Sequence, residues 1–484
     1  MSQSGISGRE LVIVCLLLFL SVALRCYHLG EESIWYDEAV SIKMAGAPAT
    51  QVISGQVHDA GNPPLYYFLL RHWLKLLQSQ SESSARSLSA VFGVLGVLSL
   101  YWIGRAWFGA KVAVIAALIL ALSPAHIELS QEARCYALAI FLTIISFYYL
   151  EKLKHSNKAP DYVLYLLSTL SLIYSHYYGL VALFVQFIYL NLPGAGSGRG
   201  RFWRNWIFLL LVVLYAPWLP VLLSQMSASV SRSEETWYLH ALALPYYLTV
   251  GRTLAWRDAG LTGFALAESA VLLVIAFPAW KGAGAFLQRT PLILFWLLGI
   301  FTVALLISIT ITPLFNTRYL SLILPAFAWI LGSGLLQIWG QKKWLGQAEF
   351  LIIAVLVAIS LFKMFTARQK EDWRSVAAYI EAHRNVEEAV LLYPGYFDLP
   401  FRYYDHEQTK LFPLLASPAD DRLRTHPGGM VVQDDIAALR GAWLVRGVAS
   451  RSWEASGYQN NLERIFPHCE QREFCRLKLL HFWK

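Results

Sequence analysis

Long apolar runs separated by short polar loops fill the first three quarters of the chain. Each run approaches the roughly 20 residues that a helix needs to cross a bilayer, so the pattern predicts about eleven transmembrane helices. These predicted helices cover about 11–24, 87–104, 111–123, 135–150, 161–174, 177–192, 206–224, 262–280, 291–312, 319–339 and 347–365. Only 15% of the 484 residues are charged, whereas soluble domains carry about 25%. The sequence therefore predicts a polytopic α-helical membrane protein.

The pattern changes after about residue 370. Residues 371–380 alternate as an amphipathic helix does, and residues 389–393 and 442–445 resemble short buried strands. We expect a transmembrane domain over 1–368, with a polar loop at 27–86, and a soluble C-terminal α/β domain over 369–484.

Basic residues between the apolar runs predict the orientation. They are Arg9, Arg105, Lys111, Lys152, Lys154, Lys158, Arg199, Arg201, Arg204, Lys281, Arg289, Lys342 and Lys343, and they fall on alternate loops. The positive-inside rule then places the N-terminus in the cytoplasm and the C-terminal domain outside an inner (plasma) membrane. This asymmetry accounts for the net charge of +8 better than nucleic-acid binding does. No small-residue cleavage site follows the first run, which favours an uncleaved anchor over a signal peptide.

Most of the polar residues that could take part in catalysis or binding fall on the predicted outer face. It carries Asp37, Glu38, His58, Asn62, residues 126–136, His176, a loop at about 225–260 and Arg318. Nucleotide-sugars are cytoplasmic, so a reaction on this face needs a substrate delivered on a lipid carrier.

The adjacent carboxylates Asp37 and Glu38 suit inverting glycosyl transfer. One carboxylate would accept the acceptor's proton while the acceptor oxygen attacks the anomeric carbon, and a phosphate leaving group would need only positive charge to stabilise it. The structural alternative is a pair of solvated acids, or an N-cap for a helix that begins near Ala39.

Two arginines are candidates for that positive charge. Arg134 could bind a phosphate with Glu132 orienting it or ligating a metal, although the two could instead form a salt bridge at a helix end. Arg318 has the planar fork that binds phosphate in two places, or it could anchor a helix at the interface.

Histidines and cysteines give weaker signals. The histidines His58, His126, His176 and His240 are all predicted outside, but no two have a ligand-type spacing, and each is more often a hydrogen-bonded or surface residue. A disulfide between Cys469 and Cys475 is conceivable if the C-terminal domain is exported.

Taken together, the motifs resemble GT-C membrane glycosyltransferases, specifically the family 39 or protein-mannosyltransferase-like group that includes the bacterial lipid A aminoarabinose transferases. The matching motifs are Trp35–Ala39, Asn62–Tyr67, Ser123-Pro124, Gln131–Leu138, His176-Tyr177, Thr317–Leu320 and Asp372–Arg374. The resemblance implies a polyprenyl-phosphate sugar donor, transfer on the outer face, Asp37 as base and in some relatives a divalent metal ion, for which His58 is the weak candidate ligand. Many relatives carry Lys or His where this chain has Asn62, which puts a phosphate or metal contact from that position in doubt.

The resulting hypothesis is an inverting transferase that moves one sugar to a lipid, glycan or protein hydroxyl. Asp37 would be the base and Glu38 its support. The expected substrate-binding residues are Asn62, Tyr66, Tyr67, Glu132, Arg134, Tyr136, His176, Arg318 and Tyr319, with Trp237 lining the cavity. The alternatives are a flippase for lipid-linked saccharide and a scaffold whose exported C-terminal domain binds a partner. A flippase would need charges or broken helices at the bilayer midplane, and the apolar runs contain few charges.

Overall fold

The computed structural model of the chain consists of two compact units. The membrane unit is Met1–Leu29 with Met44–Thr366, and the C-terminal unit is Gly30–Lys43 with Ala367–Lys484. The sequence-based division assigned the whole of 27–86 to the first domain, whereas residues 30–43 group with the C-terminal unit. The residues described are 7–55, 61–155, 158–192, 199–229, 237–252, 256–311, 315–367, 370–385, 387–406, 409–413, 439–448 and 458–484.

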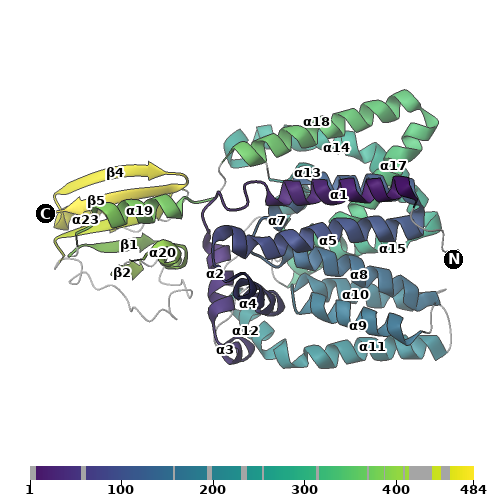
Figure 1. The fold of residues 1–484 in the computed structure, drawn as a ribbon, viewed down its shortest axis with the longest axis horizontal. Coiled ribbons are helices and arrows are strands. Elements are labelled where there is room, and N and C mark those ends of the chain that lie inside the picture. Colours follow the sequence, from purple (N-terminus) through teal and green to yellow (C-terminus); the bar gives the residue numbers. More distant parts are fainter. Residues whose placement is uncertain are drawn as a thin grey trace. The chain divides into compact units, whose positions relative to one another are not determined.

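The membrane unit is a bundle of helices (Figure 1). In chain order its helices are α1 (Gly8–Cys26), α3 (Ala49–Ile53), α4 (Leu65–Leu77), α5 (Glu82–Phe108), α6 (Ala110–Leu122), α7 (Pro124–Ser130), α8 (Tyr136–His155), α9 (Ala159–Ile173), α10 (Tyr178–Asn191), α11 (Arg199–Tyr215), α12 (Leu219–Ser229), α13 (Trp237–Val250), α14 (Trp256–Arg289), α15 (Leu292–Leu294), α16 (Ile300–Thr310), α17 (Leu324–Gln341) and α18 (Lys343–Thr366). A further helix, α2 (Tyr36–Gly46), begins within the residues of the C-terminal unit.

Seven helices within the described ranges are long and apolar enough to cross a membrane, or eight if the bent pair α6–α7 counts as one span. The predicted spans at 161–174 and 177–192 form the shorter apolar helices α9 and α10, and the run at 11–24 lies in α1. Only 6% of the most apolar stretch of α18 is buried, so most of that helix presents hydrophobic side chains outward. Such a surface is expected to face lipid.

The break between α6 and α7 bends the chain by 60°. Pro124 begins α7, and the Ser123 hydroxyl caps it by accepting a hydrogen bond from the His126 backbone N–H at 3.3 Å. Proline suits the first position of a helix, because the N–H there would have no partner within the helix. Proline also stops α6 from continuing, because it has no N–H to donate to the preceding turn. The bend directs the chain into the segment that contains Glu132 and Arg134.

Helices α14 and α17 approach each other at backbone distance. A Cβ atom added to Gly282 would lie 1.9 Å from the Ile330 carbonyl oxygen, and one added to Gly334 would lie 1.7 Å from the Pro278 carbonyl oxygen. Small residues at both contacts are what allow two membrane helices to pack this closely.

The prediction of a loop over 225–260 is wrong for most of its described part. Residues 237–250 form α13, and α14 begins at Trp256. The sequence of α13 is apolar on all sides and contains Pro245, so it shows no amphipathic stripe from which a helix could be recognised.

The C-terminal unit is built on a five-stranded sheet of order β2-β1-β3-β5-β4. The strands are β1 (Ala389–Tyr393), β2 (Leu411–Pro413), β3 (Gly441–Gly447), β4 (His468–Phe474) and β5 (Leu477–Trp483), and the helices are α19 (Trp373–His383), α20 (Asp398–Tyr404) and α23 (Tyr458–Ile465). Strands β2, β1 and β3 are parallel, whereas β5 is antiparallel to both β3 and β4. The predicted amphipathic helix and both predicted strands are confirmed.

Alternate residues of the central strands point to opposite faces of this sheet, and each face has its own core. Val390 and Leu392 of β1 pack with α19 and α20, whereas Leu391 and Tyr393 pack with residues of α23. All five cysteines of the chain lie in described segments and are free thiols, so Cys469 and Cys475 are not bonded to each other.

The buried carboxylate of Glu388, the residue directly before β1, joins the start of this strand to β3 and β5. It accepts hydrogen bonds from Trp443 Nε1 at 2.7 Å, His481 Nε2 at 3.2 Å and the Asn385 backbone N–H at 3.1 Å. Burial alone would raise the pKa of Glu388, but the hydrogen bonds from Trp443, Asn385 and His481 outweigh burial and lower the pKa below its ordinary 4.5. The unfolded chain therefore binds this proton more readily than the folded one does.

We expect Glu388→Gln to lower the free energy of unfolding of the C-terminal unit by about 2 kcal/mol at pH 7, because the hydrogen bonds lose their charged acceptor. The difference should shrink as the pH falls below 4.5 through the lowered pKa, where wild type loses the same contribution. Amide hydrogen exchange in β1 and β3 measures this at each pH. The control is Glu387→Gln, whose carboxylate forms an exposed pair with Arg440 at 2.6 Å and should matter little.

Candidate functional site

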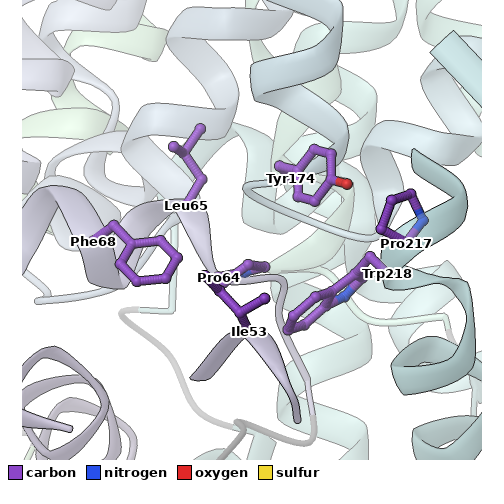
Figure 2. Close-up of a pocket in the computed structure, with 7 residues that line it drawn as sticks. All are labelled: Ile53, Pro64, Leu65, Phe68, Tyr174, Pro217 and Trp218. Atoms are coloured by element: carbon purple, nitrogen blue, oxygen red, sulfur yellow. The ribbon is translucent and has the colours of Figure 1, made fainter. Parts of the chain in front are cut away.

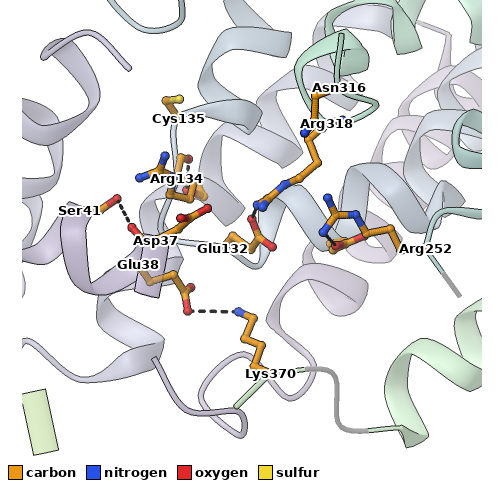
Figure 3. A network of polar contacts seen from close by, with 12 residues as sticks. Asp37, Glu38, Ser41, Glu132, Arg134, Cys135, Arg252, Asn316, Arg318 and Lys370 are labelled. Atoms are coloured by element: carbon orange, nitrogen blue, oxygen red, sulfur yellow. Dashed lines mark hydrogen bonds and ion pairs between the residues drawn. The ribbon is translucent and has the colours of Figure 1, made fainter. Parts of the chain in front are cut away.

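An ion pair between Glu132 and Arg318 forms the centre of the candidate site in the membrane unit (Figure 3). Glu132 is 3% exposed and Arg318 is 5% exposed, so both charges are largely removed from water. The Arg318 guanidinium also lies over the Tyr136 ring, 4.8 Å from its centroid. Breaking a buried pair of this kind typically costs 3–5 kcal/mol, so neither partner can be replaced without consequence.

The Glu132 carboxylate pairs with Arg318 from a distant part of the chain, a pairing that sequence spacing does not indicate. Arg134 is itself buried, at 4% exposure. Its carbonyl oxygen accepts a hydrogen bond from the Ser89 hydroxyl at 3.0 Å, and Ser89 is 2.7 Å from the Tyr66 hydroxyl. Both arginines interact electrostatically with the Tyr136 hydroxyl. Two guanidinium groups and one carboxylate are therefore buried in this part of the membrane unit.

The Asn62-Pro63-Pro64 motif supports the same segment. Asn62 is buried and its Oδ1 accepts a hydrogen bond from Cys135 Sγ at 3.1 Å. Helix α4 begins at Leu65, directly after Pro64, which places Tyr66 and Tyr67 in its first turn. Asn62 therefore ties the Pro-Pro turn to the residue after Arg134.

Aromatic rings surround Tyr136 in the membrane unit. The Tyr319 ring stacks at 6.3 Å from Tyr136, and the His176 ring lies 5.5 Å from Tyr136 and 5.3 Å from Tyr319. His176 is held by the turn before α10, where its Nδ1 accepts a hydrogen bond from the Tyr178 backbone N–H at 3.1 Å. Four of the predicted substrate-binding residues thus come together: Tyr136, His176, Arg318 and Tyr319.

Sequence reasoning missed a second charged pair and a tyrosine nearby. Arg252 Nη1 lies 3.6 Å from Glu128 Oε1, and the Tyr247 hydroxyl interacts electrostatically with both of them and with Arg318 and Glu132. Gly251 allows this approach, because its φ is +68° and a Cβ there would lie 3.1 Å from the backbone of α7. The available sequence signal was the Gly251-Arg252 pair at the end of an apolar run, a typical helix C-terminus.

Reciprocal hydrogen bonds hold α7 between its neighbours. Arg25 of α1 donates to the carbonyl oxygens of Ala121 and Leu120 at the end of α6, at 3.2 and 3.4 Å, and to His126 Nδ1 at 2.6 Å. Gln131, directly after α7, donates in return to three carbonyls at the end of α1: Leu24 at 3.2 Å, Arg25 at 3.3 Å and Tyr27 at 2.8 Å. Carbonyls at helix ends need such donors, above all within a membrane. The residue that follows Gln131 is Glu132, so these bonds fix the start of the site.

We expect Gln131→Met to destabilise the protein by about 1–3 kcal/mol, because the apolar side chain keeps the volume but removes the donors for α1. Thermal unfolding of the purified protein gives the comparison with wild type. As a control, Tyr165→Phe removes one buried interhelical hydrogen bond, to Gln186 Oε1 at 2.8 Å, away from α1. Both variants should unfold at a lower temperature, but only Gln131→Met should expose the C-terminal end of α1 to amide exchange.

The carboxylates Asp37 and Glu38 lie in the first turn of α2, among the residues of the C-terminal unit. The helix begins at Tyr36, so neither acid is its N-cap. Glu38 is fully buried and its Oε2 lies 3.2 Å from Lys370 Nζ, toward which it points in Figure 3. Asp37 is half-buried, and its carbonyl oxygen accepts a hydrogen bond from the Ser41 hydroxyl at 3.1 Å. Glu38 is thus committed to Lys370, whereas Asp37 lies next to it with a more accessible side chain.

An apolar hollow of about 190 Å³ lies beside the Pro-Pro turn in the membrane unit (Figure 2). Its lining comes from α3, the start of α4 and the residue before it, the residue after α9, and the 3₁₀ helix Ala216–Trp218: Ile53, Pro64, Leu65, Phe68, Tyr174, Pro217 and Trp218. The Tyr174 carbonyl oxygen accepts a hydrogen bond from the Leu65 backbone N–H at 3.0 Å, which joins two sides of the hollow.

Within the ranges that the structure describes, no three His, Cys, Asp or Glu side chains gather as a metal site would require. His58 lies outside the described residues, and so does the side chain of Trp237. His126 and His176 are both buried in the membrane unit and make the contacts given above.

Comparison with known proteins supports the fold. Residues 61–223 match the family model of dolichyl-phosphate-mannose-protein mannosyltransferases. No curated protein sequence matches the chain. Among solved structures, ArnT from Cupriavidus metallidurans in the apo state aligns over 98% of both chains with a TM-score of 0.62 and 15% identity.

Two further structures agree. The same ArnT bound to undecaprenyl phosphate aligns over 98% of both chains with a TM-score of 0.57 and 14% identity. The oligosaccharyltransferase of Archaeoglobus fulgidus in complex with zinc and sulfate gives a TM-score of 0.54 at 12% identity, over 93% of this chain and 69% of that one.

The chain therefore has the fold of these structures, and its long apolar helices are those of a multi-pass membrane protein. This likeness agrees with the resemblance predicted from the sequence motifs. The family match contains these predicted site residues: Asn62, Tyr66, Tyr67, Glu132, Arg134, Tyr136 and His176.

Proposed function

We propose that this protein is an inverting glycosyltransferase that moves a single sugar from a polyprenyl-phosphate donor to a hydroxyl group on the outer face of the inner membrane. The observation that carries the proposal is the burial of two arginines, Arg134 and Arg318, together with the ion pair between Arg318 and Glu132. Buried charges in a membrane protein are costly and are usually kept for function. A phosphate is the ligand for which paired guanidinium groups are best suited.

The donor phosphate would bind to Arg318 and Arg134. The Arg318 guanidinium, which pairs with Glu132 in this structure, would then contact the carboxylate and the phosphate together. When the bond from the anomeric carbon to the phosphate oxygen breaks, the negative charge that develops on that oxygen is stabilised by the same arginines. The rings of Tyr136, His176 and Tyr319 would exclude water around the phosphate.

Asp37 would be the general base. It would accept the proton of the acceptor hydroxyl as that oxygen bonds to the anomeric carbon, which gives one displacement and inversion. Glu38 cannot share this role while it is paired with Lys370, so it orders the turn. The proposal therefore separates a base on α2 from a leaving-group site around α7 and α8.

The lipid part of the substrate would need an apolar surface. The hollow beside Pro64 offers one, next to the turn that carries Tyr66 and Tyr67. We propose the polyprenyl chain as its occupant, in accord with the ArnT structure that contains undecaprenyl phosphate. Trp218→Ala should then raise the KM for a long-chain donor more than that for a short-chain one.

The acceptor class is proposed more broadly as a lipid, a glycan or a protein. A divalent ion also remains part of the proposal; within the described residues it would have to rely on Asp37 and the donor phosphate oxygens, because no three side-chain ligands gather there. Loss of transfer on chelation, with recovery on adding Mg²⁺ or Mn²⁺, would establish the ion.

The experiment that tests the proposed function uses the purified full chain in lipid nanodiscs with a panel of polyprenyl-phosphate sugars. Release of the polyprenyl phosphate and inversion at the anomeric carbon of the product are the expected results. Mass spectrometry of cell-surface lipids and glycans from a deletion strain would identify sugar and acceptor together. Movement of the lipid-linked sugar across a vesicle membrane without any glycosidic product would support a flippase instead.

A further inference from the structure

The chain that leads into α2 is fastened to α19 by one arginine. The Arg374 guanidinium donates from Nη2 to the Gly30 carbonyl oxygen at 3.0 Å and from Nη1 to the Glu31 carbonyl oxygen at 3.3 Å. The rigid fork of a guanidinium can hold two adjacent carbonyls at once, which an amine cannot do. Arg374 therefore fixes the direction of the backbone shortly before Asp37.

Ser33 is bound from two sides by the start of α19. Its Oγ accepts a hydrogen bond from the Arg374 backbone N–H at 3.2 Å, and its hydroxyl donates to Asp372 Oδ1 at 3.3 Å. Asp372 Oδ1 also accepts the Ser375 backbone N–H at 3.2 Å and so caps α19. The Asp372-Trp373-Arg374 motif thus serves its own helix and the approach to α2 together.

Lys370 joins both ends of the turn. Its Nζ pairs with the fully buried Glu38, and its backbone N–H donates to Glu32 Oε1 at 3.2 Å. Between them, the Ile34 backbone N–H donates to the Tyr404 hydroxyl at 2.7 Å. A buried carboxylate without its partner is strongly unfavourable, so Lys370 keeps Glu38 in place.

From these contacts we propose that Arg374 and Lys370 are positioning residues that hold the turn bearing Asp37 in the orientation required for proton transfer. The inference rests on the proposed function, in which Asp37 is the base. It gives the C-terminal unit a part in the reaction that neither the fold nor the relatives assign. A base must reach the acceptor proton within hydrogen-bonding distance, so a small displacement lowers kcat. The donor KM is set by the arginines of the membrane unit and should not change.

The first test compares Arg374→Gln with Arg402→Gln. Arg402 lies on α20 in the same unit, is mostly exposed, and pairs with Asp398 at 3.8 Å, so it controls for the loss of one guanidinium. We expect Arg374→Gln to lower kcat about tenfold or more, with the donor KM within about twofold of wild type. Arg402→Gln should keep both values. A wild-type kcat in Arg374→Gln would overturn the inference.

Hydrogen exchange of the full chain in nanodiscs supplies a readout that does not depend on activity. Amides in residues 30–43 should exchange faster in Arg374→Gln than in Arg402→Gln, while those of β1 and β3 stay protected in both. Unchanged exchange in 30–43 would also overturn the inference. If wild type shows no transfer with any donor, the proposed function fails, and the exchange result still decides whether Arg374 anchors the turn.

Lys370 is tested by a rescue. Lys370→Met leaves the Glu38 charge buried without its partner and should lower kcat about tenfold or more. Adding Glu38→Gln removes that charge and should restore part of kcat if the pair only positions the turn. A double variant as inactive as Lys370→Met, with normal exchange in 30–43, would overturn this assignment for Lys370.

Discussion

Asp37→Asn should lower kcat by about 10²- to 10⁴-fold, the range that removal of a general base typically gives. The substitution keeps the size of the side chain but replaces the carboxylate with a neutral amide that cannot act as a base. The side chain lies in the first turn of α2 beside Glu38, which is paired with Lys370. The donor KM should change little, because the phosphate is assigned to arginines. Initial rates with purified protein at equal expression, across a range of donor and acceptor concentrations, separate the two constants.

The control for this variant is Asp161→Asn. Asp161 lies in the first turn of α9 and pairs with Lys152 at 3.6 Å, so it loses the same charge in the same helical position away from the site. It should retain wild-type kcat. Full transfer by Asp37→Asn on the native acceptor would show that another group takes the proton.

Arg318→Lys should raise the donor KM by about tenfold or more, while Arg318→Gln should lose nearly all activity and much of its stability. The lysine keeps the positive charge but not the planar fork that contacts Glu132 and covers the Tyr136 ring. The glutamine leaves Glu132 charged and buried, at a cost of about 3–5 kcal/mol. Titration with polyprenyl phosphate alone, followed by thermal unfolding, measures donor binding without turnover.

Arg105→Gln is the matched control for that pair of variants. Arg105 makes two hydrogen bonds with Glu10, at 2.7 and 2.9 Å, between α5 and α1, and this pair is partly exposed. We expect a small loss of stability and an unchanged donor KM, because an ion pair between solvent-accessible groups contributes little. Equal effects of Arg105→Gln and Arg318→Gln on donor binding would mean that Arg318 acts only through general stability.

Local patterns were enough to predict much of the fold. The helix α19 and the strand at 389–393 could each be predicted from a pattern of ten residues or fewer, because the spacing of their apolar residues reflects which face is buried. Strands β2, β4 and β5 were missed. β4 is an edge strand with mostly exposed residues, so it lacks the alternation that identifies a half-buried strand.

Which residues pair with one another in the candidate site could not be predicted from the sequence. Nothing in the local sequence of Glu132 indicates that its carboxylate pairs with Arg318, 186 positions away. Likewise nothing in the local sequence of Asp37 and Glu38 indicates that Lys370 and Arg374 hold them. Pairings of this kind depend on how distant segments pack, which composition and periodicity do not encode.

The backbone contact between α14 and α17 limits how the membrane unit can move. At Gly282 and Gly334 the backbones of the two helices are in contact, so sliding or rotation of one helix against the other would produce a steric clash. We therefore expect α14 and α17 to behave as one rigid pair. If helices of the membrane unit move apart to admit a long lipid, α14 and α17 should not separate from each other. A bulky residue engineered at Gly334 should damage assembly in the membrane before it affects catalysis.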